Sequence, residues 1–465
     1  MLAALAAYAA HGISQELPIS VIHHAKRAII DWLASAFPGS RLPPATILEE
    51  ALADDLDRGD AEMVSGRRAT ARAAALINAT ASHIVELDDI FRDAIFHPGA
   101  PIISAALAVG QTQGVAGARF LRGVIVGYEI STRIGVAVNP SHYKYWHTTG
   151  TVGCIGAAAA AAVIYGCSES QIAHALATST TFASGLQQAF RSSTMSKPLH
   201  AGHAADIGVW TAKSALLGLT GAIDILDGPS GFGIAMSNSP DWSGALAGLG
   251  VDFNIENITF KTHACCGHTF PALDGVLSMR AAHGLTPENV TRIVIGTTQE
   301  SIDVAGNASP RDENGAKFSL PFVVASGLIY GKSLRVDAFE PQRLADERIR
   351  DVMRRVELEV DHDIQSRFPK QRAARITVTT SDGRHISHFQ PMRKGDPELP
   401  LTDMELEEKF LELATPSIGA LTAERLLRSL WALDQRRNMA GLLKDVRESM
   451  AADSKTRSIG EQRQF

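Results

Sequence analysis

The chain has 465 residues, more than one typical globular core holds, so we expect two domains. A composition of 45% hydrophobic and 20% charged residues excludes a disordered or fibrous chain. The formal net charge of -6 disfavours a nucleic-acid groove or an anionic membrane surface as the main partner, but it leaves room for a local basic pocket that binds an anionic substrate. The four cysteines show no C-x-x-C spacing, which predicts a reducing, cytoplasmic setting.

Apolar residues at three- and four-residue steps, in an alanine-rich context, predict an all-helical region before about residue 260. Strand signals are nearly absent there. No stretch reaches the roughly 20 uninterrupted apolar residues of a membrane span, so we expect no membrane partner. The opening residues are taken as the first helix, and the further predicted helices cover residues 20–37, 69–87, 104–113, 118–138 and 204–219.

The pattern changes after about residue 285, where β-branched and polar residues alternate over 290–298, 355–361 and 373–389. Asp382-Gly383 predicts a hairpin turn inside the last of these stretches. Helical spacing returns after Thr402, which forms a capping-box pattern with Glu405. We therefore predict a mainly α protein with an all-helical domain (1–265), a smaller α+β domain (266–395) and C-terminal helices (396–465), ending in a frayed tail at 454–465.

Two carboxylates and a histidine stand in the segment "ELDDIFRDAIFHPGAP". Asp88 and Asp89 follow a long helical pattern, and the macrodipole disfavours carboxylates at a helix C-terminus by up to about 1 kcal/mol. Either one of them orients a base or a substrate-binding group, or both lie on a solvated helix end. His97 precedes Pro98 and Gly99 in a turn that can hold an imidazole in a cleft, although a lone loop histidine is often only a surface residue.

A histidine also precedes the small-residue helix in "WHTTGTVGCIGAAAAAA". If the helix begins near Thr148, His147 lies at its positive end, which lowers the pKa of the imidazole and favours the neutral form that a general base needs. Tight helix packing accounts for the glycines and alanines. It does not account for the Trp-His-Thr-Thr that comes before them.

Lys197 precedes Pro198 in "SKPLHAGHAADIGVW", so a helix can start just after it. Desolvation and the helix dipole would both favour a neutral amine there, the form that acts as a base, but a solvated lysine is an open alternative. The segment "KTHACCGHTF" suggests a metal site, but its cysteines are adjacent and lack the usual two-residue spacer. We therefore expect no metal in this segment.

Taken together, these segments resemble the MmgE/PrpD family in their order and approximate spacing, over nearly the whole chain. They are "ELDDIFRDAIFHPGAP", "WHTTGTVGCIGAAAAAA", "SKPLHAGHAADIGVWTA" with "LTGAIDILDGPSGF", and "KTHACCGHTFPALD". That family includes 2-methylcitrate dehydratase, cis-aconitate decarboxylase and iminodisuccinate epimerase. The resemblance implies a metal-free, cofactor-free homodimer whose C-terminal helices return to the helical domain. It also implies an active site between the domains, formed by positions matching Asp89, His97, His147 and Lys197.

These reactions share chemistry at the carbon beside a carboxylate, which needs a base near neutrality and groups that stabilise the enediolate. We predict His147 and Lys197 as the two bases, His97 as the group that orients the substrate carboxylate, and Asp89 as the partner of an imidazole. The further candidates are assigned to binding a small polycarboxylate substrate and are Asp88, Tyr145, Thr148, His200, Lys261 and His268.

The choice of reaction depends on two departures from the family pattern. Decarboxylase and dehydratase relatives often carry a threonine after the paired aspartates and a tyrosine in the segment matching "FSLPFVVASGL", where this chain has Ile90 and Phe322. Fewer proton donors favour an epimerase of an iminodisuccinate-like amino polycarboxylate. The alternatives are a dehydratase or decarboxylase acting on 2-methylcitrate, cis-aconitate or a similar acid, and a catalytically silent helical dimer that binds a carboxylate or a partner protein.

Overall fold

The computed structural model describes residues 1–11, 16–191, 194–368 and 371–451, and it divides into two compact units. Unit 1 comprises Met1–Ile84, Asp88–Thr259 and the chain from Thr402 onward, and unit 2 comprises Val85–Leu87 and Phe260–Leu401. Apart from Val85–Leu87, unit 2 is the continuous segment Phe260–Leu401, and the sequence predicts a smaller domain over 266–395. The tail predicted to be frayed lies outside the described residues.

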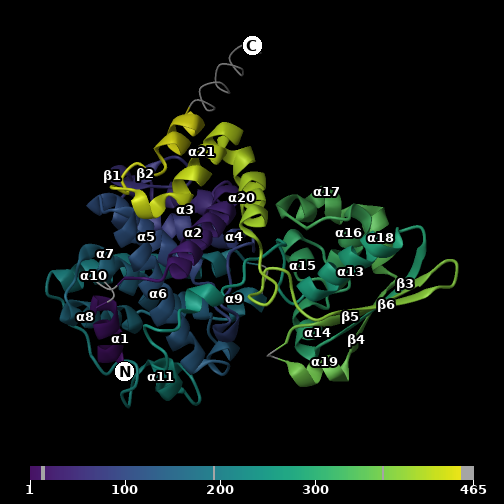
Figure 1. The fold of residues 1–465 in the computed structure, drawn as a ribbon, viewed down its shortest axis with the longest axis horizontal. Helices are drawn as coiled ribbons and strands as arrows, with labels where there is room; N and C mark the ends of the chain where they lie inside the picture. Colours follow the sequence, from purple (N-terminus) through teal and green to yellow (C-terminus); the bar gives the residue numbers. More distant parts are fainter. Residues whose placement is uncertain (12–15, 192–193, 369–370, 452–465) are drawn as a thin grey trace, which may run out of the picture. The chain divides into compact units, whose positions relative to one another are not determined.

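Unit 1 is built almost entirely from helices, as its alanine-rich periodicity predicts (Figure 1). Its α-helices are α1 (Leu2–His11), α2 (Ile19–Gly39), α3 (Ala45–Ala51), α4 (Ala71–Ile84), α5 (Gly99–Gln113), α6 (Gly117–Val138), α7 (Thr148–Tyr165), α8 (Glu169–Thr181), α9 (Gln188–Arg191), α10 (Ser196–Leu216), α11 (Phe232–Met236), α12 (Trp242–Ala245), α20 (Asp403–Ile418) and α21 (Ala420–Trp431). Its 3-10 helices are η1 (Ala53–Asp55), η2 (Arg92–Ala94), η3 (His142–Lys144), η4 (Asn254–Asn257) and η6 (Leu433–Gln435).

Helix α7 forms the centre of unit 1. It packs against α5, α6, α8 and α10, and its glycines and alanines let those neighbours approach closely: a Cβ placed on Gly156 would lie 2.7 Å from the Cβ of Ser131 on α6. By length and composition α7 is the one described helix that could cross a membrane, but 94% of it is buried inside the protein. It is therefore the core helix of unit 1.

The chain returns to unit 1 through α20 and α21, which lie beside α2 (Figure 1). Thr402 and Glu405 form the predicted capping box at the start of α20. Farther along α20, the Nζ of Lys409 lies 2.6 Å from Oδ1 of Asp31 on α2, and both side chains are buried. This fully buried ion pair links two segments from opposite ends of the sequence.

A small hairpin in unit 1 was not predicted. Strand β1 (Leu56–Glu62) pairs antiparallel with β2 (Arg68–Ala69), and the register shifts between Leu56 and Ala61. The sequence LDRGDAE has neither the β-branched nor the aromatic residues that signal a strand. Buried Glu62 holds strand β1 in place instead. Its backbone N–H donates to Gln111, and its carboxylate accepts from Leu443 and Arg447.

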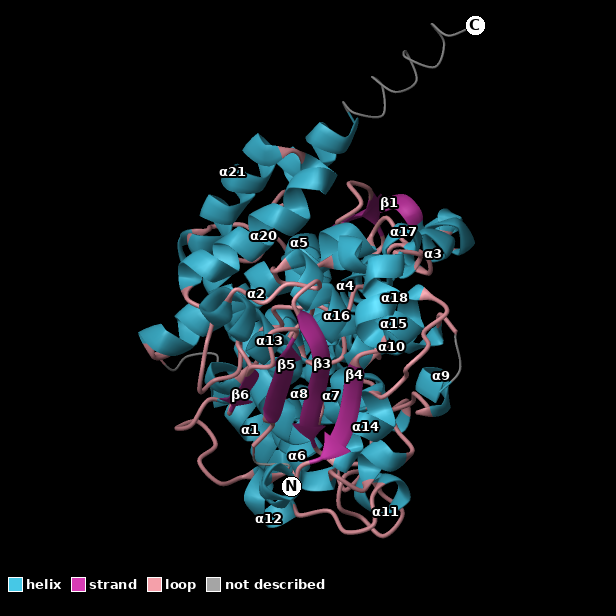
Figure 2. Cartoon of the chain, turned by 90° about the vertical axis from the view of Figure 1, so that its right-hand side faces the viewer, coloured by secondary structure: helices cyan, strands magenta, loops and turns pink. Residues whose placement is uncertain are grey.

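Unit 2 contains a mixed four-stranded sheet in the order β4-β3-β5-β6 (Figure 2). Strand β3 pairs parallel with β4 and antiparallel with β5, and β5 pairs antiparallel with β6 across the predicted Asp382-Gly383 turn. Helix α13 packs against β5 and β6. The elements of unit 2 are α13 (Phe270–His283), β3 (Val290–Thr297), α14 (Gln299–Ala305), α15 (Glu313–Lys317), α16 (Leu320–Tyr330), η5 (Val336–Phe339), α17 (Pro341–Leu344), α18 (Glu347–Met353), β4 (Val356–Val360), α19 (His362–Arg367), β5 (Ala374–Thr380) and β6 (His385–Gln390).

Candidate active site

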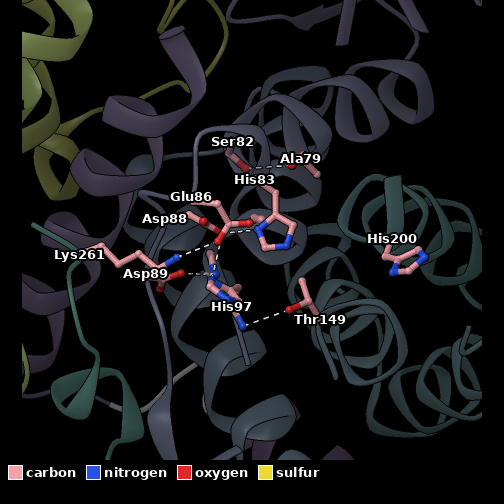
Figure 3. A network of polar contacts seen from close by, with 12 residues as sticks. Ala79, Ser82, His83, Glu86, Asp88, Asp89, His97, Thr149, His200 and Lys261 are labelled. Atoms are coloured by element: carbon pink, nitrogen blue, oxygen red, sulfur yellow. Dashed lines mark hydrogen bonds and ion pairs between the residues drawn. The ribbon is translucent and has the colours of Figure 1, made fainter. Parts of the chain in front are cut away.

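Two imidazoles share one buried carboxylate in unit 1 (Figure 3). Nδ1 of His83, at the end of α4, lies 2.6 Å from Oδ2 of Asp88, and Nδ1 of His97 lies 3.3 Å from the same oxygen. The rings of His83 and His97 meet edge to face, 4.8 Å apart. Within the described residues, Nε2 of His83 and Oδ1 of Asp88 are buried and have no hydrogen-bond partner.

His147 adds a third imidazole to this cluster. It is the N-cap of α7, as predicted, and its backbone N–H donates to the carbonyl of Gly185. Its ring lies 5.5 Å from the ring of His83 and nearly parallel to it, and its Nδ1 lies 3.1 Å from Nδ1 of His200 on α10. One of these two Nδ1 atoms donates to the other, which requires at least one of the two imidazoles to be neutral.

The cluster combines a carboxyl and two imidazoles whose pKa values are all lowered. Burial opposes ionisation of Asp88, but its electrostatic interactions and hydrogen bonds with His83 and His97 hold the pKa of its carboxyl well below the usual value. Burial, followed by electrostatic interactions with His83 and Lys197, holds the pKa of His147 well below the usual value. Burial and His83 lower the pKa of His200 to about 4. The lowered pKa of His147 favours the neutral imidazole, and burial is its largest cause.

Three helices begin at this cluster. His97 lies just before the first residue of α5, His147 caps α7, and His200 lies in the second turn of α10. The three ends are adjacent, because the N–H of His97 donates to Oγ1 of Thr149 on α7 and His147 contacts His200. Helix N-termini carry partial positive charge and free N–H groups, so this arrangement favours an anionic ligand.

Asp89, predicted as the partner of an imidazole, hydrogen-bonds two other groups. Its Oδ2 accepts a 2.8 Å hydrogen bond from Tyr128 on α6, and its Oδ1 accepts one of 3.0 Å from the N–H of Gly99. The carboxylate that contacts imidazoles is Asp88. The chain between α4 and η2 passes through a turn and bends, so the sequence alone could not tell which of the two carboxylates contacts the imidazoles.

The remaining predicted residues of unit 1 differ in exposure. Lys197 lies in the first turn of α10, which begins at Ser196 and so slightly earlier than predicted, and its charge acts on both His147 and His200. Thr148 is fully buried, whereas the side chain of Tyr145 is 58% exposed.

Lys261 and His268 lie in unit 2. The Nζ of Lys261 is 3.1 Å from Oε2 of Glu86, and Nδ1 of His268 is 3.1 Å from Oγ of Ser301. Burial and nearby arginines lower the pKa of His268 to about 3. Neither contact joins these residues to the imidazole cluster.

The side chains of "HACCGH" bind other partners. His263 contacts Asp274 and Leu334, and Cys265 contacts Thr269. Across the part of the chain that the structure describes, one group of donor atoms is close enough to share an ion, within 4.8 Å, and it is the His83, Asp88 and His97 group rather than this segment.

Two further residues, His83 and Tyr128, were not predicted from the sequence. His83 is a histidine in the last turn of a predicted helix, shortly before Asp88. That spacing alone could have marked it as a partner for the carboxylate. Tyr128 is a lone phenol inside an apolar helix, where a buried hydroxyl needs a polar partner.

Both parts of the chain match the domains of one known protein family. Residues 3–245 match the MmgE/PrpD N-terminal domain and residues 263–435 match the MmgE/PrpD C-terminal domain. A cis-aconitate decarboxylase-like protein of Aspergillus oryzae is 26% identical over 92% of this chain and 93% of its own. Cis-aconitate decarboxylase of Homo sapiens is 28% identical (91% and 89%), and that of Aspergillus terreus is 23% identical (91% and 90%). The chain belongs to the MmgE/PrpD family.

Proposed function

We propose that the protein is an enzyme that performs acid–base chemistry at the carbon beside a carboxylate of a small polycarboxylate, without a metal or an organic cofactor. The observation that carries this proposal is the neutral His147, held between His83 and His200 where three helices begin. A neutral buried imidazole can accept a proton from carbon, and the surrounding groups favour the negative charge that then develops.

The charge of the site supports a substrate with several carboxylates. The N-termini of α5, α7 and α10 and the ammonium of Lys197 supply positive potential, while Asp88 is the one carboxylate that contacts the imidazoles among the described residues. One substrate carboxylate would accept N–H groups at the helix ends. A second, bonded to the reacting carbon, would carry the enediolate charge.

Asp88 supports the acid–base role of the imidazoles. By accepting from Nδ1 of His83 it selects the tautomer with a lone pair on Nε2, and it stabilises the imidazolium when that nitrogen takes a proton. His97 contacts the same oxygen and is partly open to solvent. The pair can therefore store a proton beside His147 and return it to carbon.

Among reactions of this type we propose a lyase acting on cis-aconitate or a similar citrate-like acid. Relatives that match this chain over most of their length are named cis-aconitate decarboxylases. In such a decarboxylation the carbon–carbon bond to one carboxylate breaks, its electron pair stays on the substrate, and an imidazolium donates the proton that replaces the released carbon dioxide.

Epimerisation of an iminodisuccinate-like acid is the second candidate, and Phe322 is the observation that favours it. This residue stands where a phenolic proton donor was expected for a lyase, and its ring packs 5.9 Å from that of Phe339 in unit 2. An epimerase needs only a base on one face of the carbon and an acid on the other. The reaction itself must decide between the two candidates.

The test is proton NMR in deuterated water with purified protein and three acids: cis-aconitate, 2-methylcitrate and a diastereomerically pure iminodisuccinate. Loss of carbon dioxide or water from either of the first two acids supports the lyase. Solvent deuterium in an inverted product, with no other change, overturns it and supports the epimerase.

The control is His147→Asn, which should abolish the reaction of the best substrate. A folded wild-type protein that exchanges no proton with any of the three acids, nor with related di- and tricarboxylates, would instead support a silent carboxylate-binding protein.

A further inference from the structure

We propose that Tyr128 and Asp89 form a buried clamp that positions His97, so that both are positioning residues rather than proton-transfer residues. The proposal rests on the proposed function, because it assigns these two side chains a place in the same site. It concerns the His97-Pro98-Gly99 turn, whose Gly99 N–H donates to Asp89.

The clamp consists of two hydrogen bonds in series. The hydroxyl of Tyr128 donates to Oδ2 of Asp89 over 2.8 Å, and Oδ1 of Asp89 accepts from the N–H of Gly99 over 3.0 Å. Tyr128 is fully buried in α6 and Asp89 is 2% exposed. Helix α6 thereby fixes the first residue of α5, and with it the turn that carries His97.

The space around Gly99 is fitted to this clamp. A Cβ placed on Gly99 would lie 2.8 Å from Oδ1 of Asp89 and 2.8 Å from the hydroxyl of Tyr128. Any side chain at this position must push apart the two groups that hold the turn. Glycine is therefore required here by close approach rather than by backbone conformation.

The other side of His97 is held by different residues. Its N–H donates to Oγ1 of Thr149, and its Nδ1 contacts Asp88. Thr149 thus holds the backbone of His97 and Asp88 contacts its imidazole, while Asp89 holds the turn at Gly99. Catalytic geometry is sensitive to shifts of about 1 Å, so a loosened turn should lower turnover.

The charge of Asp89 is consistent with a holding role. Burial and the nearby Asp31 raise the pKa of its carboxyl well above the usual value, and burial and Asp89 itself raise the pKa of Tyr128. The neutral form that a raised pKa favours is imitated by an asparagine, whose amide oxygen can accept from Gly99 and whose amide nitrogen can donate to Tyr128.

The first experiment removes the clamp with Tyr128→Phe. We expect kcat for the best substrate to fall roughly tenfold with KM within about twofold, and the imidazole signals of His97 to shift in spectra of protein with isotope-labelled histidine. The control is Tyr330→Phe in unit 2, which removes a similar 2.9 Å bond from a tyrosine to Asp346 and should leave kcat and the His97 signals unchanged.

The second experiment tests whether the parts act as one unit. Gly99→Ala should reproduce the kinetic effect of Tyr128→Phe, and the double variant should lose little more than either single variant, because the clamp is already broken. Independent effects that multiply in the double variant would overturn the proposal.

The third experiment compares two replacements of Asp89. Asp89→Ala should lower kcat as Tyr128→Phe does, and Asp89→Asn should restore most of that loss. If the asparagine variant is as impaired as the alanine variant, Asp89 transfers a proton or supplies a charge, and the positioning role is wrong. A wild type inactive on every acid would remove the proposed function alone, since the His97 signals still report on the clamp.

Discussion

Lys197 and His147 are the two predicted bases, and they differ in how a substitution can test them. Lys197→Arg keeps a positive charge but removes a group that can lose its proton, since a guanidinium stays protonated in proteins. We expect turnover to fall about a hundredfold or more, the order of a general acid–base contribution, while substrate binding survives in part. Steady-state kinetics and calorimetric binding measure the two effects. Near-wild-type turnover would mean that Lys197 only anchors a carboxylate.

Sequence patterns located most of the site residues but could not assign all their contacts. "WHTTG" predicted His147 at the start of a helix because the break between polar and small residues is local information. The choice between Asp88 and Asp89 depends on the turns and bends that follow α4, which no periodicity records. The pairing of His83 with Asp88 could have been predicted from their spacing, but its contact with His97 appears only when the chain folds back.

At the scale of elements, the contact of α2 with α20 depends on the buried pair of Asp31 and Lys409. Lys409→Met removes the ammonium from a fully buried carboxylate, and we expect a loss of about 3–5 kcal/mol in the free energy of unfolding. Asp31→Leu combined with Lys409→Met should recover most of that loss, because no buried charge is then left without its counter-ion. Urea unfolding of the three proteins measures this, and an additive loss in the double variant would contradict it.

The capping box of α20 makes a smaller contribution. Thr402→Ala leaves the N–H of Glu405 without its hydroxyl acceptor, and we expect a cost of about 1 kcal/mol. Thr402→Ser keeps the acceptor and serves as the control in the same unfolding measurement. The start of α20 was predictable because the capping box lies within four residues. Strand β1 was not predictable, because the partners of Glu62 lie far away in sequence.

For the whole molecule, buried neutral histidines make stability depend on pH. His142 is fully buried and hydrogen-bonded to Thr151 and Met236, and burial lowers its pKa from 6.5 to about 4. Between these values the unfolded chain binds a proton that the folded chain does not, so stability falls as the pH drops from about 6.5 to 4. The shift corresponds to about 3 kcal/mol at 1.36 kcal/mol per pH unit.

We therefore expect His142→Gln to have a lower free energy of unfolding at pH 7 and a shallower decline towards pH 4. Urea unfolding at several pH values measures both. The same substitution at the exposed His283 should leave the decline unchanged. An unaltered slope in His142→Gln would show that other groups cause the acid sensitivity.

Metal dependence is also a property of the whole enzyme. The charge stabilisers that we propose are imidazoles, helix ends and Lys197, so dialysis against a strong chelator should leave turnover intact. The donor atoms that could hold a metal ion belong to His83, Asp88 and His97 and lie within 4.8 Å of one another. Loss of activity that added zinc alone restores would make this group a catalytic metal site.

The pairing of Asp31 with Lys409 also has a consequence for synthesis on the ribosome. The two residues are 378 positions apart, so at 5–20 residues per second the nascent chain carries Asp31 for roughly 20 to 75 s before its lysine exists. During that time all of unit 2 emerges, while the face of α2 that α20 will cover has no partner. The contact of α20 with α2 can form only after the inserted unit 2 has been translated, so this face of α2 stays uncovered until then.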